Sequence, residues 1–323
     1  MRAIRIEQAG GPEVIQVVDV PVPQPKPGQV LVRNQAIGVN FADTYNRTGL
    51  YPLKLPSGLG IEGAGVVEAI GDGVTRLAVG DSVGYVSGPS GAYAEFHVAE
   101  AGRTVKLPAG VDARLAAAAM VKGMTAEYLV RRCYPLKAGE WALVHAAAGG
   151  TGQILVQWAR HIGARVIATV GSPDKAAIAR RLGAEEVILY REQDVAAEVK
   201  RITGGAGVAV AYDSVGASTF EGTLASLARR GVFVSFGNAS GPPPAVEPLR
   251  LQRAGSVYLT RPTMADYVRT TEELDDSAGA LFQLIGQGVI KIAIGQEFPL
   301  AEARRAHEAL ESRSTTGSIL LIP

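Results

Sequence analysis

The sequence predicts an α/β protein in which a partly open β-barrel precedes a parallel sheet flanked by helices. The first 122 residues hold short β-branched stretches separated by frequent glycine and proline turns, which is typical of a compact β-barrel. Between residues 123 and 260, strand and helix patterns alternate at the spacing of βαβ units. With 323 residues, of which 47% are hydrophobic and 20% charged, the chain is long enough for two domains with packed cores.

The first stretch is read mainly as strands and turns. Strands are predicted at residues 14–20, 29–37 and 63–70. The proline-rich segment 21–28 breaks any regular ladder, because proline donates no backbone hydrogen bond. The segments between the strands carry glycine turn signals, which supports many short strands rather than a few long ones.

The middle stretch is read as a buried parallel sheet. Its six candidate strands are near-continuous apolar runs without polar alternation, as expected for strands covered on both faces. These strands lie at residues 141–146, 165–170, 186–190, 208–213, 231–236 and 256–260, with helices at 152–162 and 173–182 among them.

The last stretch, residues 261–323, is predicted to contain two helices and two strands. The helices are placed at 264–287 and 300–312, and the strands at 291–297 and 317–322. The final strand is expected to return to the first sheet. We therefore predict one domain from residues 1–122 and 261–323 and a second from residues 123–260.

Charge and cysteine content exclude several classes of protein. The chain has 32 Lys and Arg against 31 Asp and Glu, so it lacks the basic excess of a nucleic-acid-binding protein. The single cysteine, Cys133, cannot form an intramolecular disulfide or a multi-cysteine zinc site. The charged N-terminus and the lack of a run of about 18 apolar residues predict neither a signal peptide nor a membrane span. We expect a cytoplasmic protein.

The strongest motif lies between the first strand of the middle stretch and its first helix. It reads His-Ala-Ala-Ala-Gly-Gly-Thr-Gly over residues 145–152. Aligned with the dinucleotide-binding pattern G-x-G-x-x-G, it places Ala147, Gly149 and Gly152 at the three glycine positions. Gly149 would let the backbone approach a pyrophosphate, and Gly152 would let the helix pack close to the strand. The predicted phosphate-binding residues are Ala148, Gly149, Gly150, Thr151 and Gly152, and the alternative is a glycine-rich turn that binds nothing.

The next strand ends without the carboxylate that binds the ribose 2′-hydroxyl of NAD. Gly171 and Ser172 follow instead, with Ser172 predicted as a helix cap and Pro173 as the first helical residue. Lys175 then lies in the first helical turn, where a cation opposes the helix dipole unless it binds a 2′-phosphate. These residues favour NADP(H) over NAD(H). The alternative for Lys175 is an ordinary solvated lysine.

Other strand ends supply further candidates, because ligands of open α/β sheets bind at the carboxyl ends of strands. Tyr190 and Arg191 follow the third strand, where they would cover the adenine and support the phosphate. The alternative for Tyr190 is a rim residue. Two more turns would meet the nicotinamide half through their backbones, unless they are plain strand-end turns. Their candidate residues are Ser214, Val215, Phe236, Gly237 and Asn238.

Taken together, these segments resemble the zinc-less quinone oxidoreductases of the medium-chain dehydrogenase/reductase superfamily, which include the ζ-crystallin type. The similarity spans the whole chain and is carried by residues 40–45, 58–65, 146–152, 212–216 and 234–238. The resemblance implies a GroES-like catalytic domain from both chain ends, a Rossmann doubly wound domain between them, and NADPH. It also implies a homodimer formed partly through the strand from Ser256 to Thr260.

Zinc-dependent members of the superfamily carry a Gly-His-Glu motif that supplies a metal ligand. Here the motif reads Gly60-Ile61-Glu62, and isoleucine cannot bind metal. The four histidines are scattered along the chain, and their spacing does not build a three-ligand site, so core or surface roles are expected for them. We therefore predict no metal.

The resemblance further implies a set of catalytic residues. Asn40 and Thr125 would touch the nicotinamide ribose and ring. Tyr45 and Tyr51 would line a flat pocket, unless they only pack in their loop. The full set is Asn40, Asp43, Tyr45, Tyr51, Lys122 and Thr125.

Three charged residues complete this expectation. Lys122 would bias the site toward the phosphates of the cofactor or toward a developing anion. A turn or cap role is an alternative for Asp43. Arg313 would reach the cofactor, unless it is a solvated arginine.

The predicted chemistry follows from the lack of a Lewis acid. Alcohol oxidation needs a stabilised alkoxide, which zinc supplies in the zinc-dependent members. A quinone is already an electrophile, and positioning with hydrogen-bond donors suffices to reduce it. We expect an NADPH-dependent quinone reductase that transfers hydride to a small-molecule quinone, without a nucleic-acid or membrane partner. The alternatives are a zinc-free NADPH-dependent reductase of enone or enoyl double bonds, and a non-enzymatic NADPH- or RNA-binding structural protein.

Overall fold

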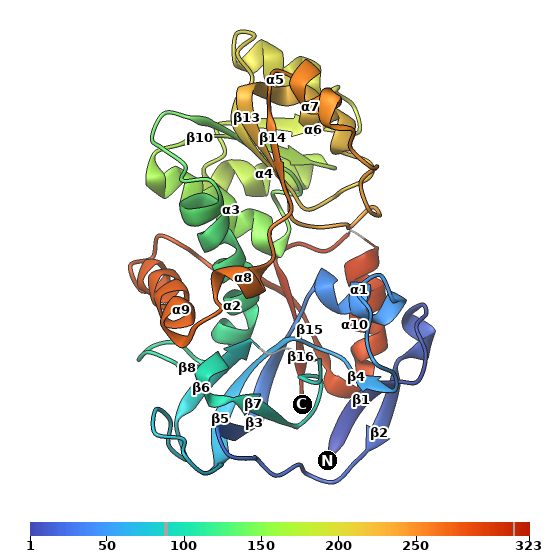
Figure 1. Cartoon of the computed structure of the whole chain (residues 1–323), viewed down its shortest axis with the longest axis vertical. Coiled ribbons are helices and arrows are strands. Elements are labelled where there is room, and N and C mark those ends of the chain that lie inside the picture. Colours follow the sequence, from blue (N-terminus) through green and yellow to red (C-terminus); the bar gives the residue numbers. More distant parts are fainter. Residues whose placement is uncertain (87–89, 313) are drawn as a thin grey trace. The chain divides into compact units, whose positions relative to one another are not determined.

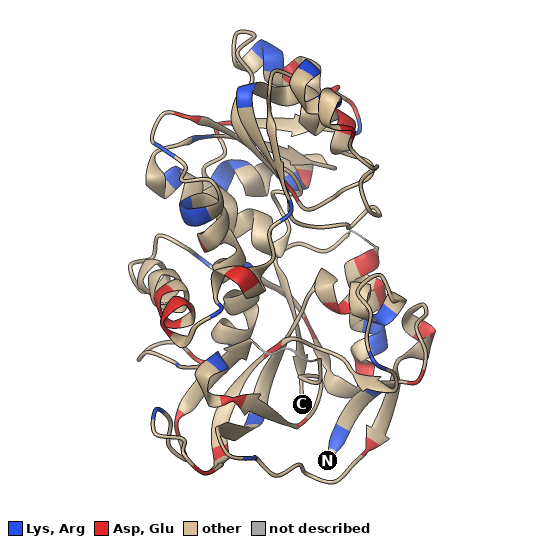
Figure 2. Ribbon diagram, viewed as in Figure 1, with Lys and Arg blue, Asp and Glu red and all other residues tan. Residues whose placement is uncertain are grey.

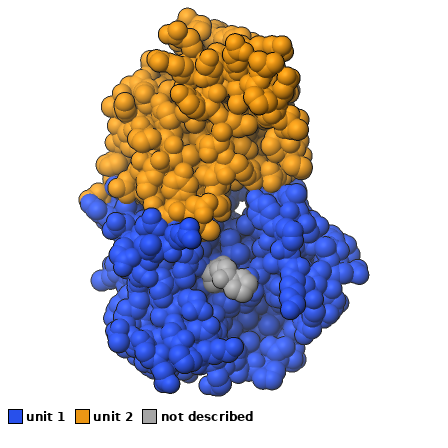
Figure 3. Space-filling model, viewed as in Figure 1, with its two compact units in different colours: residues 1–122, 268–286, 292–323 blue, residues 123–267, 287–291 orange. Residues whose placement is uncertain are grey.

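The computed structural model describes residues 1–86, 90–312 and 314–323. It divides into two compact units (Figure 3). Unit 1 comprises residues 1–122, 268–286 and 292–323, and unit 2 comprises residues 123–267 and 287–291. Helices and strands carry the labels of Figure 1.

Two short segments lie in unit 2 although the sequence placed them with the chain ends. Residues 261–267 stay with unit 2, where the ring of Tyr267 stacks on that of Tyr128 at a centroid distance of 4.4 Å. Residues 287–291 also belong there, because Lys291 exchanges two hydrogen bonds of 2.8 and 3.1 Å with the Gln157 amide. The predicted division into independently folding domains remains a prediction.

Unit 2 is built on a six-stranded parallel sheet. In spatial order its strands are β11 (Glu186–Leu189), β10 (Arg165–Val170), β9 (Trp141–Val144), β12 (Val208–Asp213), β13 (Leu227–Ser235) and β14 (Tyr258–Thr260). Counted along the unit, this is the order 3-2-1-4-5-6 of a doubly wound Rossmann sheet. The order reverses between β9 and β12, and ligands of such sheets bind at the carboxyl ends of strands beside this point.

Helices connect the strands of unit 2. Helix α3 packs with α4, and α5 packs with α6 (Figure 1). The aromatic rings of Phe220 and Phe233 lie 5.2 Å apart in one buried cluster, which also contains Val199 of α5. The helices are α3 (Gly150–Ile162), α4 (Pro173–Leu182), α5 (Val195–Ile202), α6 (Phe220–Ser226), α7 (Pro248–Arg253) and α8 (Met264–Tyr267).

The described residues of unit 1 form two sheets. The smaller has the order β2 (Gln16–Asp19), β1 (Arg2–Ile6), β4 (Ser57–Gly58). The larger has the order β15 (Ile294–Pro299), β16 (Ser318–Ile322), β3 (Gln29–Val39), β5 (Glu62–Ile70), β6 (Ser82–Val86) and β8 (Thr104–Lys106), and β7 (Phe96–Glu100) also pairs with β3. The predicted return of the final strand is confirmed, because β16 pairs antiparallel with β3.

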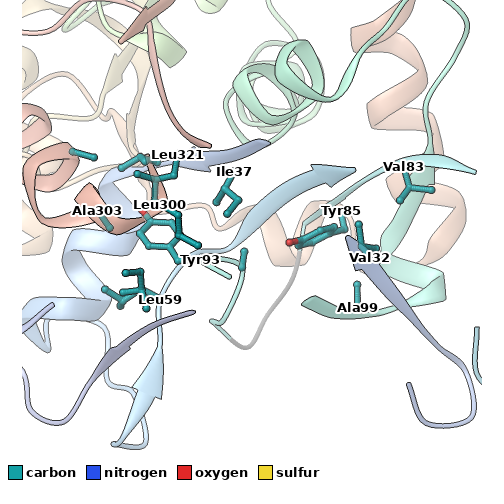
Figure 4. Close-up of a cluster of buried hydrophobic side chains, with 14 of the residues drawn as sticks. Val32, Ile37, Leu59, Val83, Tyr85, Tyr93, Ala99, Leu300, Ala303 and Leu321 are labelled. Carbon is teal, nitrogen blue, oxygen red and sulfur yellow. The ribbon is translucent and has the colours of Figure 1, made fainter. Parts of the chain in front are cut away.

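The core of unit 1 joins residues from distant parts of the chain (Figure 4). Ile37 of β3 and Leu321 of β16 lie in the same cluster as Tyr93, which is fully buried. Ala303, on the C-terminal helix α10 (Ala303–Glu311), completes it from another element. Residues from both ends of the chain therefore lie in unit 1.

Two helices were missed by the strand-and-turn interpretation of the first stretch. Helix α1 (Phe41–Thr48) begins after Asn40 and ends at Gly49, whose positive φ of 80° closes it. Helix α2 (Ala113–Tyr128) begins after Asp112, whose side chain accepts a 2.8 Å hydrogen bond from the Leu115 amide. A run of alanines after Asp112 was the overlooked signal, because alanine is the strongest helix former.

The predicted helix at 264–287 is two helices, α8 and α9 (Thr271–Gly286). Between them Thr270 and Glu273 form a capping box, in which each side chain accepts from the other's backbone amide. This Thr-x-x-Glu pattern marks a new helix start, so the continuous helix was wrong.

Among the described residues, no helix is long and apolar enough to cross a membrane.

Candidate active site

The glycine turn of unit 2 connects β9 to α3 as predicted. A Cβ on Gly152 would lie 2.8 Å from the Ala147 Cα and still closer to the Ala146 carbonyl oxygen, so helix and loop pack too closely for any side chain there. At Gly149, the helix N-cap, the nearest atom to a Cβ is the Ala146 oxygen at 3.2 Å. The protein's own packing thus demands glycine at 152 far more than at 149.

The sharp turn at the start of this loop lies at Ala146 rather than at Ala147. Ala146 has a positive φ of 50°, a conformation that costs a non-glycine residue energy. Ala147 is buried, and its amide donates to the Thr169 carbonyl of β10 at 3.3 Å. The loop is therefore anchored on the neighbouring strand, while the first-turn amides of α3 lack intrahelical partners and can bind phosphate.

Next to this loop, buried polar side chains connect the carboxyl ends of β9, β10 and β12 through hydrogen bonds. His145 follows β9 directly, and its Nδ1 lies 2.9 Å from the Thr169 hydroxyl and its Nε2 2.9 Å from the Thr223 hydroxyl. Thr223 donates to Asp213 at the end of β12 at 2.8 Å. Burial lowers the pKa of His145, so the imidazole is neutral. His145 therefore has a core role, in which its ring connects Thr169 of β10 with Thr223 of α6 at the carboxyl edge of the sheet.

The turns after β12 and β13 are closely interlocked. Asp213 accepts from the amides of Val215 and Gly216 at 2.7 and 3.1 Å. A Cβ on Gly237 would lie 2.8 Å from the Ser214 Cα, so the two turns touch through their backbones. The Phe236 amide donates to the Asp213 carbonyl at 2.8 Å. The structure thus brings these predicted nicotinamide-side residues together.

Arg261 holds the second turn, and the sequence did not single it out. Its guanidinium donates to the Gly237 carbonyl at 3.0 Å. It also donates to the side-chain oxygen of Asn238 at 3.2 Å, when that amide is turned so that its oxygen faces the guanidinium. A lone arginine after an edge strand carries no pattern that predicts this contact.

The predicted 2′-phosphate residues lie together at the ends of β10 and β11. Ser172 caps α4, with its hydroxyl accepting from the Lys175 amide at 3.5 Å, and Pro173 is the first helical residue. A Cβ on Gly171 would lie 2.6 Å from the Tyr190 hydroxyl and 3.4 Å from Arg191. Burial and the neighbouring Arg191 charge lower the pKa of the Lys175 ammonium. The two cations are thus close enough for their charges to act on each other.

In unit 1, Glu62 is the centre of a cluster that contains two predicted residues. Its carboxylate accepts from the Asn40 amide at 2.9 Å, from Lys122 Nζ at 3.2 Å and from the Val121 backbone at 2.7 Å. Glu62 is 1% exposed and Lys122 is 7% exposed. Gly38 leaves the room that this carboxylate fills. We name Asn40, Glu62 and Lys122 the Glu62 cluster.

Sequence reasoning missed Glu62 as a site residue, although it stands in the quoted Gly60-Ile61-Glu62 segment. The available signal was a carboxylate inside an otherwise glycine- and alanine-rich strand start. Such a charge is seldom buried without a partner, and the partner here is Lys122.

Asp43 takes the cap role that was left open for it. Its Oδ2 accepts from the Asn40 backbone amide at 2.8 Å and from the Tyr93 hydroxyl at 2.9 Å. The side chain is fully buried, and burial raises its pKa to about 7. Asp43 therefore connects the start of α1 with the interior of unit 1.

The remaining predicted residues are placed as follows. Tyr45 and Tyr51 form an edge-to-face pair at 5.2 Å, with Tyr45 buried and Tyr51 38% exposed. Thr125 lies on the unit 2 part of α2 and shares a side-chain hydrogen bond with Tyr128. Arg313 lies outside the described residues.

No three His, Cys, Asp or Glu side chains gather as a metal site anywhere in the described ranges 1–86, 90–312 and 314–323. His161 is exposed on α3, whereas His307 is buried on α10.

Family models match both units. An alcohol dehydrogenase GroES-like domain matches residues 26–109, and a zinc-binding dehydrogenase domain matches residues 150–281. A quinone oxidoreductase of Pseudomonas aeruginosa is 51% identical over 323 residues, covering 100% of this chain and 99% of the relative. The chain belongs to the zinc-less quinone oxidoreductase family.

Solved structures of this family extend the comparison. The Escherichia coli quinone oxidoreductase, solved in complex with NADPH, has a TM-score of 0.98 and 48% identity, with 100% of each chain covered. A 2-haloacrylate reductase of a Burkholderia species is 43% identical over 328 residues, covering 98% of each chain. The predicted GroES-like and Rossmann architecture is confirmed.

One segment departs from the zinc-dependent relatives after which the second family model is named. A zinc-less quinone oxidoreductase needs no ligand at the central position of Gly60-Ile61-Glu62, and isoleucine stands there. The carboxylate of Glu62 is engaged by Asn40 and Lys122 instead. The side chain that borders a metal in a Gly-His-Glu motif therefore binds an ammonium group in this chain.

Proposed function

We propose that this chain is an NADPH-dependent quinone reductase. The observation that carries the proposal is the carboxyl edge of the unit 2 sheet. A glycine turn, two interlocked strand-end turns and the cations Lys175 and Arg191 all lie at this edge. A Cβ on Gly149 would meet one backbone oxygen at 3.2 Å, so the protein's own packing restricts this position less than 152, and a pyrophosphate would lie beside it. The NADPH complex of the Escherichia coli relative supports this cofactor.

NADPH is favoured over NADH by the residues at the ends of β10 and β11. The Arg191 charge lowers the pKa of Lys175, and the 2′-phosphate of NADPH would be a counter-charge for both cations. No carboxylate follows β10 in the sequence 170–172, where an NAD-specific site has one.

The bound cofactor supplies a hydride. The chain's own residues would orient the reactants. In unit 2, the backbone turns around Val215 and Gly237 would hold the nicotinamide half, and Thr125 would contact its ribose. Lys122, kept in place by Glu62, stabilises negative charge that develops on the quinone oxygen. Tyr45 and Tyr51 offer ring faces to the flat substrate.

A zinc-free reductase of activated double bonds is the second candidate function. It is favoured by the 2-haloacrylate reductase of Burkholderia, which is 43% identical across 98% of both chains. Such a reaction uses the same hydride geometry and needs a proton at the α-carbon. An RNA-binding role has less support, because basic and acidic residues are interspersed over both units (Figure 2).

The proposed assembly is a homodimer through β14. This strand lies at one edge of the six-stranded sheet and exposes 62% of Tyr258. An edge strand offers backbone groups that a second copy can pair with. Sedimentation of the native chain and of Tyr258→Asp would test it, with a dimer expected for the first and a weakened dimer for the second. A native monomer at micromolar concentration would contradict the proposal. The cytoplasmic location remains a prediction.

The test is a spectrophotometric assay of NADPH oxidation with a series of quinones and, in parallel, with enones and haloacrylates. We expect quinones to be reduced fastest and a chelator to leave the rate unchanged. Faster turnover of double-bond substrates would favour the second function. A rate that a chelator abolishes and added metal restores would refute the zinc-free site.

A further inference from the structure

Unit 1 contains a buried chain of polar side chains that leads away from the Glu62 cluster. Asp43 accepts from Tyr93 at 2.9 Å, the Tyr93 hydroxyl lies 3.2 Å from His307 Nε2, and His307 Nδ1 lies 3.0 Å from Arg47. Arg47 is 1% exposed and pairs with Glu311 at 2.7 Å. Tyr93 and His307 are fully buried. Three separate segments, α1, α10 and the segment around Tyr93, thus contribute to one series of polar side chains inside an apolar core.

The donor and the acceptor of each hydrogen bond in this series of side chains can be assigned. Arginine only donates, so His307 Nδ1 must accept from Arg47. Burial and the Arg47 charge lower the pKa of His307 to about 3, so the ring is neutral and carries its proton on Nε2. Nε2–H therefore donates to the Tyr93 oxygen, and the Tyr93 hydroxyl donates to Asp43. Because an arginine does not give up its proton, this series of hydrogen bonds cannot carry a proton from the surface to Asp43. Its role is to orient the Asp43 carboxyl group.

The two oxygens of Asp43 are unequal as a result. Oδ2 receives both the Tyr93 hydroxyl and the Asn40 backbone amide. Oδ1 is buried and has no hydrogen-bond partner among the described residues. A bare, buried oxygen disfavours the charged carboxylate, whereas the two donors on Oδ2 favour it. The balance between these effects places the Asp43 pKa at about 7, where both charge states are populated at neutral pH.

The charge state of Asp43 matters to the Glu62 cluster. Glu62 of β5 raises the pKa of Asp43 and Lys122 of α2 lowers it, so the three charges act on one another. With Asp43 neutral, Glu62 and Lys122 balance. With Asp43 ionised, the cluster has an excess negative charge beside Asn40, which opposes a quinone that is gaining negative charge.

We propose that Tyr93 and His307 are positioning residues for quinone reduction, which hold Asp43 in the orientation that lets its charge control the Glu62 cluster. The inference rests on the proposed function. The groups that face Asp43 are Tyr93, Glu62 and Lys122, and behind Tyr93 lie His307, Arg47 and Glu311.

The first experiment measures kcat/KM for a quinone between about pH 6 and about pH 9, a range that brackets the Asp43 pKa of about 7. The native chain should lose rate as pH rises through this value, and Asp43→Asn, which cannot ionise, should lack that transition. Tyr93→Phe removes one donor to Oδ2 and should move the midpoint upward by about one pH unit.

His307 is tested by two substitutions and a control. His307→Gln can accept from Arg47 and donate to Tyr93, so it should keep the native midpoint. His307→Leu leaves Tyr93 a weaker donor and should move the midpoint upward by less than Tyr93→Phe. His161→Gln, on the exposed face of α3, is the matched control and should change nothing. A merely structural role of His307 would change the rate level and leave the midpoint where it is.

A second readout does not depend on turnover. The infrared band of a protonated carboxyl, titrated in nucleotide-free protein and assigned by its loss in Asp43→Asn, should show the same midpoints in the same variants. Midpoints that stay unmoved in Tyr93→Phe, or a native pH transition that persists in Asp43→Asn, would overturn the inference. If the chain reduced no quinone but the infrared midpoints moved as expected, the proposed function would fail and the positioning role of Tyr93 and His307 would stand.

Discussion

The cofactor edge of unit 2 is made by backbone, whereas the Glu62 cluster of unit 1 is made by side chains. In unit 2, Gly152 and Gly237 allow loops to approach closely, and the groups offered to a ligand are mostly amides at strand and helix ends. In unit 1, Asn40, Glu62 and Lys122 come from segments 22 and 60 residues apart. The first kind of site depends on space and the second on balanced charge, so substitutions should damage them differently.

The largest effect is expected from removing the buried carboxylate. Glu62→Ala leaves Lys122 buried without its counter-charge, which should cost about 3–5 kcal/mol of unfolding free energy and most of the activity. Glu68→Ala on the same strand is the control, since its partner Arg33 is half-exposed and such a pair contributes about 0–1 kcal/mol. Urea denaturation of both variants checks this. Equal stabilities would show that the Glu62 cluster is not held by charge.

Packing should dominate in the backbone-built site. Gly152→Ala forces a Cβ against the Ala146 and Ala147 backbone and should cost about 1–3 kcal/mol of stability together with NADPH binding. Gly149→Ala meets only the Ala146 oxygen, at 3.2 Å, so it should lose less stability than Gly152→Ala while weakening NADPH binding by roughly tenfold, or about 1.4 kcal/mol. Gly279→Ala, with open space around it in α9, is the control, because helix propensity should raise its stability by about 1 kcal/mol and NADPH binding should stay unchanged. Thermal melts and fluorescence titrations separate the two effects, and a Gly149 variant that binds NADPH normally would contradict the phosphate role.

This contrast also explains what the sequence could predict. Glycines at strand ends and the Ser172-Pro173 cap are local signals, so the turn at 145–152 and the helix α4 were predicted close to their observed positions. Asp43 and Tyr93 are 50 positions apart in the sequence, and Tyr93 and His307 are 214 apart. No sequence pattern around any of these residues predicts their contacts. His307 was therefore assigned only a core or surface role, and Glu62 and Arg261 were not assigned at all.

Cofactor choice should respond to a single side chain. Lys175→Ala should raise the KM for NADPH by roughly 10–100-fold, the equivalent of about 1.5–3 kcal/mol for a hydrogen bond to a charged group, and leave NADH almost unaffected. Lys200→Ala, on the exposed side of α5, is the matched control. Equal losses for both nucleotides in steady-state kinetics would refute binding of the 2′-phosphate at this position.

Acid should weaken the fold through its neutral buried histidines. Burial lowers the pKa of His97 to about 4 and of His307 to about 3, and it lowers that of His145 as well. Below pH about 6.5 the unfolded chain binds protons that the folded chain does not, so each histidine costs up to about 1.4 kcal/mol of stability per pH unit. Asp43 acts in the opposite sense, because its raised pKa stabilises the fold as pH falls below about 7.

The histidines outnumber this carboxyl, so stability should decline as pH falls from about 6.5 to about 4.5. Urea denaturation at several pH values measures how the free energy of unfolding changes with pH. His307→Gln should reduce this slope by the contribution of one histidine, up to about 1.4 kcal/mol per pH unit. His161→Gln, which removes an exposed imidazole, should leave the slope as it is. Constant or rising stability over this range would contradict the neutral state of the buried rings.

The most direct measurement is a fluorescence titration of the purified native chain with NADPH and with NADH, repeated with Lys175→Ala. Saturable binding of one NADPH per chain, tighter than that of NADH and reduced to the NADH level by the substitution, is the predicted result. A native chain that binds no NADPH, or that binds the two nucleotides equally, would contradict the assignment of this strand edge to the phosphorylated cofactor.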